Sequence, residues 1–276
     1  MSSNSQNSSY PDMHTPNSDH PDIEAIADTR KDPSTTAFIR PKEPPRGVET
    51  PFDENPAKPV NSPEKYPWSA ICSLIAYDNS DTPTEYGTGW FVSSRTIVTA
   101  AHCVFGESLR GKAKRVEVLP DRATSLPILK SVRLDVPIEW ERSALEEHDY
   151  AVIQIDGIDG RKITPLEMKV PDIVAGLKIE IVGYPNDSKY RSRGSSDKQW
   201  RAQGDIQSIS TTTQIFHNAS TYEGQSGSPV LVGSGTPSIQ VIGIHTYGTN
   251  RGPGASYNRA TRLTKEVHKW IMDRRS

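Results

Sequence analysis

The stretch Gly224-Gln225-Ser226-Gly227-Ser228-Pro229 carries the most information about fold and chemistry in this 276-residue chain. A serine between glycines is typical of a tight turn that exposes the hydroxyl of Ser226. On such a turn, the backbone amides of Gly224 and Ser226 can point together at an oxygen that gains negative charge. The stretch therefore indicates a serine nucleophile, with these two amides as the candidate oxyanion hole.

Two motifs upstream supply the partners that a serine nucleophile requires. Thr99-Ala100-Ala101-His102-Cys103 closes an apolar strand, and Asp149 leads into the apolar run 151–155. A serine hydroxyl needs an imidazole to take its proton, and a buried carboxylate to hold that imidazole in one tautomer. We predict Ser226 as the nucleophile, His102 as general base and then acid, and Asp149 as the orienting carboxylate. This is the residue set of a serine endopeptidase.

Other residues of the same types are weaker candidates. Three carboxylates lie close to Asp149 in sequence: Glu146, Glu147 and Asp156. Only Asp149 directly precedes an apolar run that can anchor it. Three further histidines are interpreted as surface or packing residues: His148, His217 and His268.

The chain from Tyr66 onward consists of short apolar runs separated by glycine, proline and polar clusters. Such runs are typical of antiparallel strands. Six runs fit an N-terminal barrel, at residues 68–77, 86–92, 96–99, 115–119, 126–134 and 151–155. Six more fit a second barrel, at residues 177–184, 200–210, 212–217, 229–232, 239–245 and 259–263. We therefore predict an all-β fold of two six-stranded antiparallel β-barrels.

The fold prediction divides the chain into three parts. Residues 1–64 are predicted to be disordered or a pro-segment, because the first 63 residues hold 11 of the 22 prolines and few clustered apolar residues. Residues 65–160 form the N-terminal barrel with His102 and Asp149. Residues 161–276 form the C-terminal barrel with Ser226 and a terminal α-helix, predicted over 264–274 from its apolar face.

The composition points to no nucleic-acid or membrane partner. The chain has 32 Lys and Arg against 34 Asp and Glu, a formal net charge of −2. No apolar stretch after Met1 is long enough for a signal peptide or membrane helix. We expect a monomer that acts on polypeptides without a metal or other cofactor. Cys72 and Cys103 are too few for a disulfide framework, and whether they bond to each other stays open.

The motifs together resemble those of the chymotrypsin-type serine proteases, in segments 87–92, 99–103, 149–153 and 224–230. Within that group, segments 221–230, 241–245 and 256–267 are similar to the bacterial glutamyl endopeptidases. The likeness covers about residues 65–275. It implies two barrels with a substrate cleft between them, and it implies secretion.

The resemblance also implies a specificity pocket. Where trypsin-like enzymes carry an aspartate that binds Arg or Lys, this chain has Ser220. Thr221 and His245 match residues that glutamyl endopeptidases use to hold a glutamate carboxylate, and Thr246 and Gly248 would follow the substrate backbone. The implied preference is for glutamate or aspartate on the acyl side of the cleaved bond. A chymotrypsin-like apolar pocket, which Ser220 would suit, is the alternative.

The resemblance also implies that the chain is made as an inactive precursor, a zymogen. The contact that activates it would differ from the one in the digestive enzymes. Gln225 replaces the aspartate that pairs with a newly cut N-terminus in those enzymes. In the glutamyl relatives the mature α-amino group helps to bind the substrate carboxylate, and Val48 is the candidate new terminus here. Two other classes stay open: an inactive, protease-shaped binding module, and an intracellular processing protease tethered through its N-terminal segment.

Overall fold

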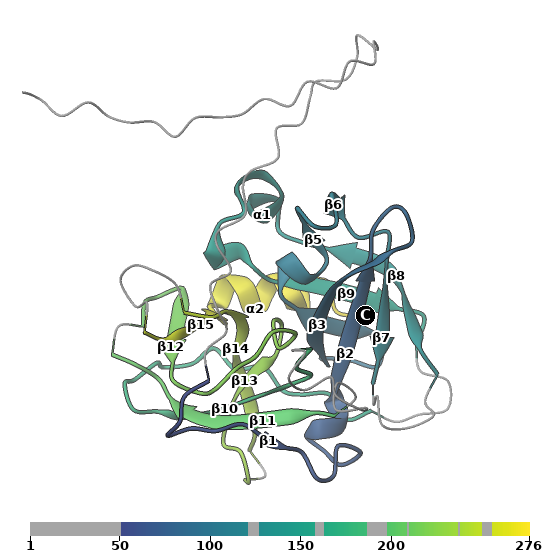
Figure 1. Cartoon of the computed structure of the whole chain (residues 1–276). Coiled ribbons are helices and arrows are strands. Elements are labelled where there is room, and N and C mark those ends of the chain that lie inside the picture. The colour runs from purple at the N-terminus through teal and green to yellow at the C-terminus, as the bar shows by residue number, and fades with distance from the viewer. Residues whose placement is uncertain are drawn as a thin grey trace, which may run out of the picture. The chain divides into compact units, whose positions relative to one another are not determined.

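Strands dominate the part of the chain that the computed structural model describes (Figure 1). This part comprises residues 51–120, 127–157, 163–186, 198–208, 210–236, 238–249 and 256–276. The strands form two main antiparallel sheets, plus a two-stranded ribbon of β5 (Phe105–Gly106) and β6 (Gly111–Lys112).

The first sheet is a closed barrel. Its strands are β2 (Ile71–Tyr77), β3 (Pro83–Phe91), β4 (Thr96–Thr99), β7 (Arg115–Leu119), β8 (Leu129–Asp135) and β9 (Ala151–Ile155), in the order β2-β3-β4-β9-β8-β7. Along β7, buried Val116 and Val118 alternate with half-buried residues, as expected when one face of a strand lines a barrel. Each of the six predicted runs overlaps one of these strands, so the prediction of this barrel is confirmed.

The second sheet has seven strands and is curled into a half-barrel. Its strands are β1 (Lys58–Pro59), β10 (Lys178–Gly183), β11 (Trp200–Asp205), β12 (Gln214–His217), β13 (Pro229–Val232), β14 (Gln240–Tyr247) and β15 (Asn258–Arg262). The order is β1-β11-β10-β13-β14-β15-β12. Each of the six predicted runs overlaps a strand, but the sheet differs from the predicted six-stranded barrel, because β1 adds a seventh strand at one edge. Ile181, Ile215 and Val230 are fully buried in the core of this sheet.

The segment 51–64 is ordered, whereas residues 1–64 are predicted to be disordered or a pro-segment. β1 pairs with β11, and the amide of Val60 donates to the carbonyl of Gln199 at 2.8 Å. Further upstream, the amide of Phe52 donates to the Ser220 hydroxyl at 2.7 Å, and that hydroxyl donates to the Phe52 carbonyl at 3.1 Å. Hydrogen bonds hold the segment, and its apolar contacts with the cores are confined to scattered residues such as Ala57 and Val60, so a periodic apolar pattern could not reveal it. Residues 1–50, including Val48, lie outside the described residues.

In the described part of the chain, two α-helices accompany the sheets, α1 (Ile138–Ser143) and α2 (Lys265–Met272). The helix α2 was predicted, and its first turn is capped by the Thr264 hydroxyl, which accepts from the amide of Val267 at 3.2 Å. Val267 and Ile271 are buried in the same core as the barrel residues. No helix in the described ranges is both long and apolar enough to span a membrane.

Strand pairing brings the predicted site together. β4 pairs with β9 in a register that sets Thr99 opposite Ala151, so the turns that carry His102 and Asp149 meet at one end of the barrel. The turn that carries Ser226 leads into β13, which pairs with β14. The amide of Thr88, in β3, donates to the carbonyl of Ser226 at 2.8 Å and so links the two sheets at this point.

Candidate active site

His102 and Asp149 form a buried, doubly hydrogen-bonded pair. Nδ1 of His102 lies 2.6 Å from Oδ2 of Asp149, and the backbone amide of His102 donates to Oδ1 at 3.0 Å. Both side chains are buried, with exposed fractions of 1% and 0%. The carboxylate therefore fixes both the position of the His102 backbone and the orientation of its ring. The structure thus brings together these two predicted residues.

The pair shifts the pKa of each partner. Burial lowers the pKa of His102, but the charge and hydrogen bond of Asp149 outweigh burial, and the net shift is upward from 6.5. Burial raises the pKa of Asp149, but the charge and hydrogen bonds of His102 outweigh it and hold that pKa below its usual value. A carboxylate opposite an imidazole that can accept a proton is the electrostatic arrangement that base catalysis requires.

Ser226 lies beside this pair but is not hydrogen-bonded to it. Its hydroxyl donates to the carbonyl of Thr246 at a long 3.4 Å. Nε2 of His102 is buried, and none of the described residues hydrogen-bonds to it. Cys103, the neighbour of His102, contacts the Ser226 carbonyl through its thiol at 3.6 Å. Ser226 is also half-buried rather than buried, so a substrate can reach its hydroxyl.

The two predicted oxyanion amides are turned away from the surrounding backbone. The carbonyl of Glu223 accepts from the amide of Asn186 at 2.6 Å, and the carbonyl of Gln225 accepts from the amide of Ser228 at 3.0 Å. In a planar trans peptide the N–H points opposite to the C=O, so the amides of Gly224 and Ser226 point the other way. Neither amide has a backbone partner among the residues described. Both can therefore donate to a ligand.

Glycine is required at two positions of the turn 224–229, which carries Ser226. Gly224 has φ +91°, and a Cβ there would meet the amide nitrogen of Asn186 at 2.6 Å. Gly227 has φ +87°, and a Cβ would lie 2.1 Å from the Thr88 carbonyl oxygen. Both the left-handed backbone and the close approach of the two sheets exclude a side chain here.

The cysteines are not bonded to each other. Cys72 and Cys103 are both buried free thiols. Cys103 packs against Gly87, where an added Cβ would lie 2.7 Å from its sulfur. The thiol of Cys103 thus fills the space between β3 and the carbonyl of Ser226.

The predicted pocket residues adjoin the turn 224–229, which carries Ser226. His245 and Thr221 are both fully buried. The carbonyl of His245 accepts from the amide of Gly227 at 2.7 Å, and Nδ2 of Asn258 donates to the Thr221 hydroxyl at 2.8 Å. Thr246 lies at a register shift between β14 and β15, and its carbonyl faces Ser226. Gly248 directly follows β14 and is buried.

Sequence reasoning missed a buried group beside the His102–Asp149 pair. The ring of Tyr247 lies 5.7 Å from that of His102, and the guanidinium of Arg259 lies 5.0 Å from the Tyr247 ring centre. Arg259 also pairs with Glu146. Burial, followed by the charge of Asp149, raises the pKa of Tyr247 well above 10, so its phenol stays neutral. No local motif marks these residues, because strand pairing assembles them.

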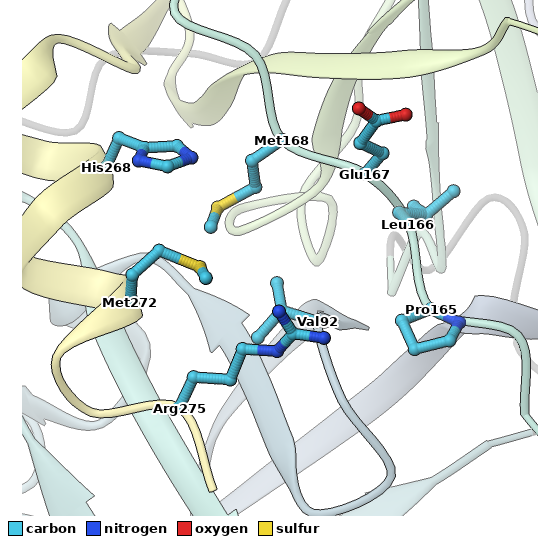
Figure 2. Close-up of a pocket in the computed structure, with 8 residues that line it drawn as sticks. All are labelled: Val92, Pro165, Leu166, Glu167, Met168, His268, Met272 and Arg275. Atoms are coloured by element: carbon cyan, nitrogen blue, oxygen red, sulfur yellow. The ribbon is translucent and has the colours of Figure 1, made fainter.

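A cavity of about 360 Å³ lies elsewhere, beside α2 (Figure 2). Met168 extends into it from the segment before β10, and Met272 and Arg275 extend into it from the C-terminal end of α2 and the residues that follow. None of the candidate catalytic side chains lines it. In the described ranges, no three His, Cys, Asp or Glu side chains gather as they would to hold a metal ion.

Comparison with known proteins identifies the family. Residues 87–244, more than half of the chain, match the trypsin-like peptidase domain. The chain belongs to the trypsin-like peptidase family. Two predicted residues that pair in the structure, His102 and Asp149, and the predicted nucleophile Ser226 all lie within the matched region.

Two curated relatives of this trypsin-like peptidase come from Bacillus. The chain is 32% identical over 216 residues to a glutamyl endopeptidase of Bacillus licheniformis, covering 75% of this chain and 63% of the relative. It is 30% identical over 220 residues to an extracellular metalloprotease of Bacillus subtilis, covering 77% and 66%. The match therefore spans just under two thirds of the length of both relatives.

Solved structures confirm the fold of this trypsin-like peptidase. A Glu endopeptidase in complex with MPD matches with a TM-score of 0.66 at 22% identity, covering 79% of this chain and 96% of that one. The protease Anisep from Arthrobacter nicotinovorans matches with a TM-score of 0.58 at 16% identity, covering 73% and 93%.

Proposed function

We propose that the chain is a serine endopeptidase that cleaves polypeptides through an acyl-enzyme on Ser226. The observation that carries this proposal is the buried His102–Asp149 pair, whose Nε2 atom is left without a partner among the described residues beside a half-buried serine. Membership of the trypsin-like peptidase family supports the same reading.

The reaction follows from the geometry. The Ser226 oxygen attacks the carbonyl carbon of the scissile bond while Nε2 of His102 takes the hydroxyl proton. The amides of Gly224 and Ser226 stabilise the oxyanion. As the C–N bond breaks, His102 gives its proton to the departing amine, leaving an ester on Ser226. Water then attacks the ester, with His102 again taking and returning the proton.

One side-chain movement precedes this chemistry. The Ser226 hydroxyl must leave the Thr246 carbonyl and turn toward Nε2 of His102. A 3.4 Å hydrogen bond is at the long limit of the interaction, so little is lost when it breaks. Catalytic hydrogen bonds often tighten only once substrate is bound. The vacated Thr246 carbonyl then faces the cleft and can accept a substrate amide.

We propose glutamate, or aspartate, as the preferred residue on the acyl side. A carboxylate that enters a buried pocket needs donors to replace its lost water. The imidazole of His245 and the hydroxyl of Thr221 are the candidate donors. One relative is named a glutamyl endopeptidase, which supports this choice. The apolar alternative has less support, because the Ser220 hydroxyl bonds to the backbone of Phe52 instead of standing open.

Zymogen activation and secretion are further parts of the proposal. His245 and Thr221 have no exposed surface in the full-length chain. Phe52, whose backbone bonds to the hydroxyl of Ser220 next to Thr221, follows the Val48 region closely in sequence. Cleavage near Val48 would then open the pocket and supply a positively charged terminus. One relative is named extracellular, which supports secretion.

The proposal is tested by kinetics on a matched pair of peptides that differ only in Glu or Gln before the cleaved bond. We expect Ser226→Ala to lower kcat by about 10⁶-fold. We expect kcat/KM for the Glu peptide to exceed that for the Gln peptide by on the order of tenfold or more, equivalent to about 1.4 kcal/mol. A preference for Phe, Tyr or Leu would favour the apolar pocket. Undiminished turnover by the alanine variant would remove Ser226 from the mechanism.

A further inference from the structure

Thr88, in β3 of the first sheet, is fully buried and bonds to the turn 224–229 of the second sheet at two points. Its amide donates to the carbonyl of Ser226 at 2.8 Å, and its hydroxyl donates to the carbonyl of Gly224 at 3.0 Å. Both directions are fixed, because a carbonyl oxygen can only accept. One residue of the first sheet therefore holds two peptide groups of the turn that carries Ser226.

One of these peptide groups lies between the two candidate oxyanion amides. The peptide that joins Gly224 to Gln225 is flanked in the chain by the peptide that carries the N–H of Gly224 and the peptide that carries the N–H of Ser226. Its carbonyl accepts from the Thr88 hydroxyl, and its N–H donates to the carbonyl of Tyr222 at 3.0 Å. This central peptide is thus bonded on both sides, which fixes the directions of its two neighbours.

The Thr88 hydroxyl is itself held in place. It accepts from the amide of Tyr184, which directly follows β10, at 3.0 Å. The carbonyl of Thr88 accepts from the hydroxyl of Thr99 at 2.7 Å, and Thr99 ends β4 just before His102. A β-branched side chain also has few χ1 rotamers, so the hydroxyl has little freedom to turn away. Thr88 therefore ties the turn 224–229 to the same part of the first sheet that carries His102.

We propose that Thr88 is a positioning residue that holds the two oxyanion amides in place relative to His102. Without its hydroxyl, the buried carbonyl of Gly224 loses its donor, and the central peptide can rotate to find another, because Gly224 has no side chain to oppose the rotation. Such a rotation turns the N–H groups of Gly224 and Ser226 away from a common point. Thr88 acts through the backbone of the turn and need not touch the substrate. This inference rests on the proposed acyl transfer to Ser226.

A role in stability alone makes a different prediction. A residue that only joins the two sheets would, when replaced, lower the amount of folded protein but leave the turnover of each folded site unchanged. A residue that positions the oxyanion amides lowers kcat of each folded site, because these amides stabilise the tetrahedral intermediate more than the bound substrate. Labelling to completion with a serine-directed phosphonate counts the competent sites, so kcat per site separates the two roles.

The test compares three substitutions, each prepared from the full-length chain in the same way as wild type, on a peptide that wild type cleaves. Thr88→Val keeps the shape but removes the hydroxyl. We expect its kcat per site to fall by between about tenfold and 100-fold while KM stays within about twofold. Thr88→Ala also lacks the hydroxyl and should lower kcat. Thr88→Ser keeps the hydroxyl and should return most of the lost turnover.

Thr84→Val is the matched control. Thr84 lies in the same strand as Thr88, and its hydroxyl donates to the carbonyl of Thr82 at 2.9 Å, within its own hairpin. The substitution is thus the same in kind but lies away from the turn 224–229. We expect kcat and KM of this variant to equal those of wild type.

Inhibition by a peptide aldehyde gives a second measure of the same property. The Ser226 oxygen bonds to the aldehyde carbon, the serine proton passes to His102, and the carbonyl oxygen becomes the oxyanion between the two amides. The corresponding peptide alcohol binds without this step. We expect Thr88→Val to weaken inhibition by the aldehyde by the same factor as it lowers kcat/KM, and to leave the inhibition constant of the alcohol unchanged.

The outcomes distinguish this inference from the proposed function. A folded wild type that neither cleaves peptides nor reacts at Ser226 overturns the proposed function itself. An active wild type together with unchanged kcat per site in Thr88→Val overturns the role of Thr88 alone. Equal weakening of the aldehyde and the alcohol would also contradict that role. So would loss of the fold in both hydroxyl-free variants, because Thr88 would then support the fold rather than the oxyanion amides.

Discussion

Asp149 controls the pKa of His102, and that control can be measured. kcat/KM requires neutral His102, whose pKa lies above 6.5, so activity on an uncharged Gln peptide should rise with pH through a midpoint above 6.5. Asp149→Asn removes the charge that raises this pKa while burial still lowers it. We expect the midpoint to move to lower pH and kcat to drop by about 10⁴-fold. A pH–rate profile with an unmoved midpoint would show that another group titrates.

His217 makes the stability of the folded chain depend on pH. Its pKa is lowered in the folded state, so below pH 6.5 the unfolded chain binds a proton that the folded chain does not. The folded state therefore loses about 1.4 kcal/mol for each pH unit below 6.5, until the lowered pKa is reached. Urea unfolding of wild type and His217→Gln at pH 7.5 and pH 5 measures this. The stability of wild type relative to the variant should decrease at pH 5, and an unchanged difference would mean that His217 is protonated in the fold.

The turn 224–229, which carries Ser226 in the second sheet, packs closely against β3 of the first sheet at Gly227. Gly227→Ala places a Cβ against the Thr88 carbonyl in a left-handed backbone, so unfolding should require at least about 2 kcal/mol less. Gly176→Ala is the control, because Gly176 has φ +79° with nothing within 4 Å of an added Cβ. The control carries the backbone strain without the clash. Equal losses of stability in the two variants would show that the close approach of the sheets contributes nothing.

Strands marked by an apolar run, and site residues that lie in a motif at the end of such a run, could be predicted from the sequence. The apolar runs that became β4 and β9 bring Thr99 opposite Ala151, so the motifs at their ends meet. β1 carried no signal, because a two-residue strand of Lys58 and Pro59 is held by backbone pairing alone.

Residues whose role depends on strand register could not be predicted. His217 meets His245 only because β12 and β14 both flank β15, and nothing in the sequence around His217 indicates this. It was interpreted as a packing or surface histidine. The same holds for Thr88, whose amide and hydroxyl bond to the carbonyls of Ser226 and Gly224.

For the whole molecule, the described N-terminal residues predict where the chain can be shortened. Removing residues 1–45 leaves the contacts of Phe52 and β1 intact, so the shortened protein should fold with unchanged thermal stability. Among mature proteins that begin at Gly47, Val48 and Glu49, we expect the Val48 form to show the highest Glu/Gln ratio. Equal ratios in all three forms and in the full-length chain would rule out a role for the α-amino group.

We propose Ser226 as the nucleophile that His102 activates. The most direct measurement is covalent labelling of the mature protein with a serine-directed phosphonate, followed by intact mass and peptide mapping. We predict one phosphonyl group per chain on Ser226, none in Ser226→Ala, and much slower labelling in Asp149→Asn. Labelling of a different residue, or an unlabelled wild-type protein that is fully folded and mature, would contradict the account.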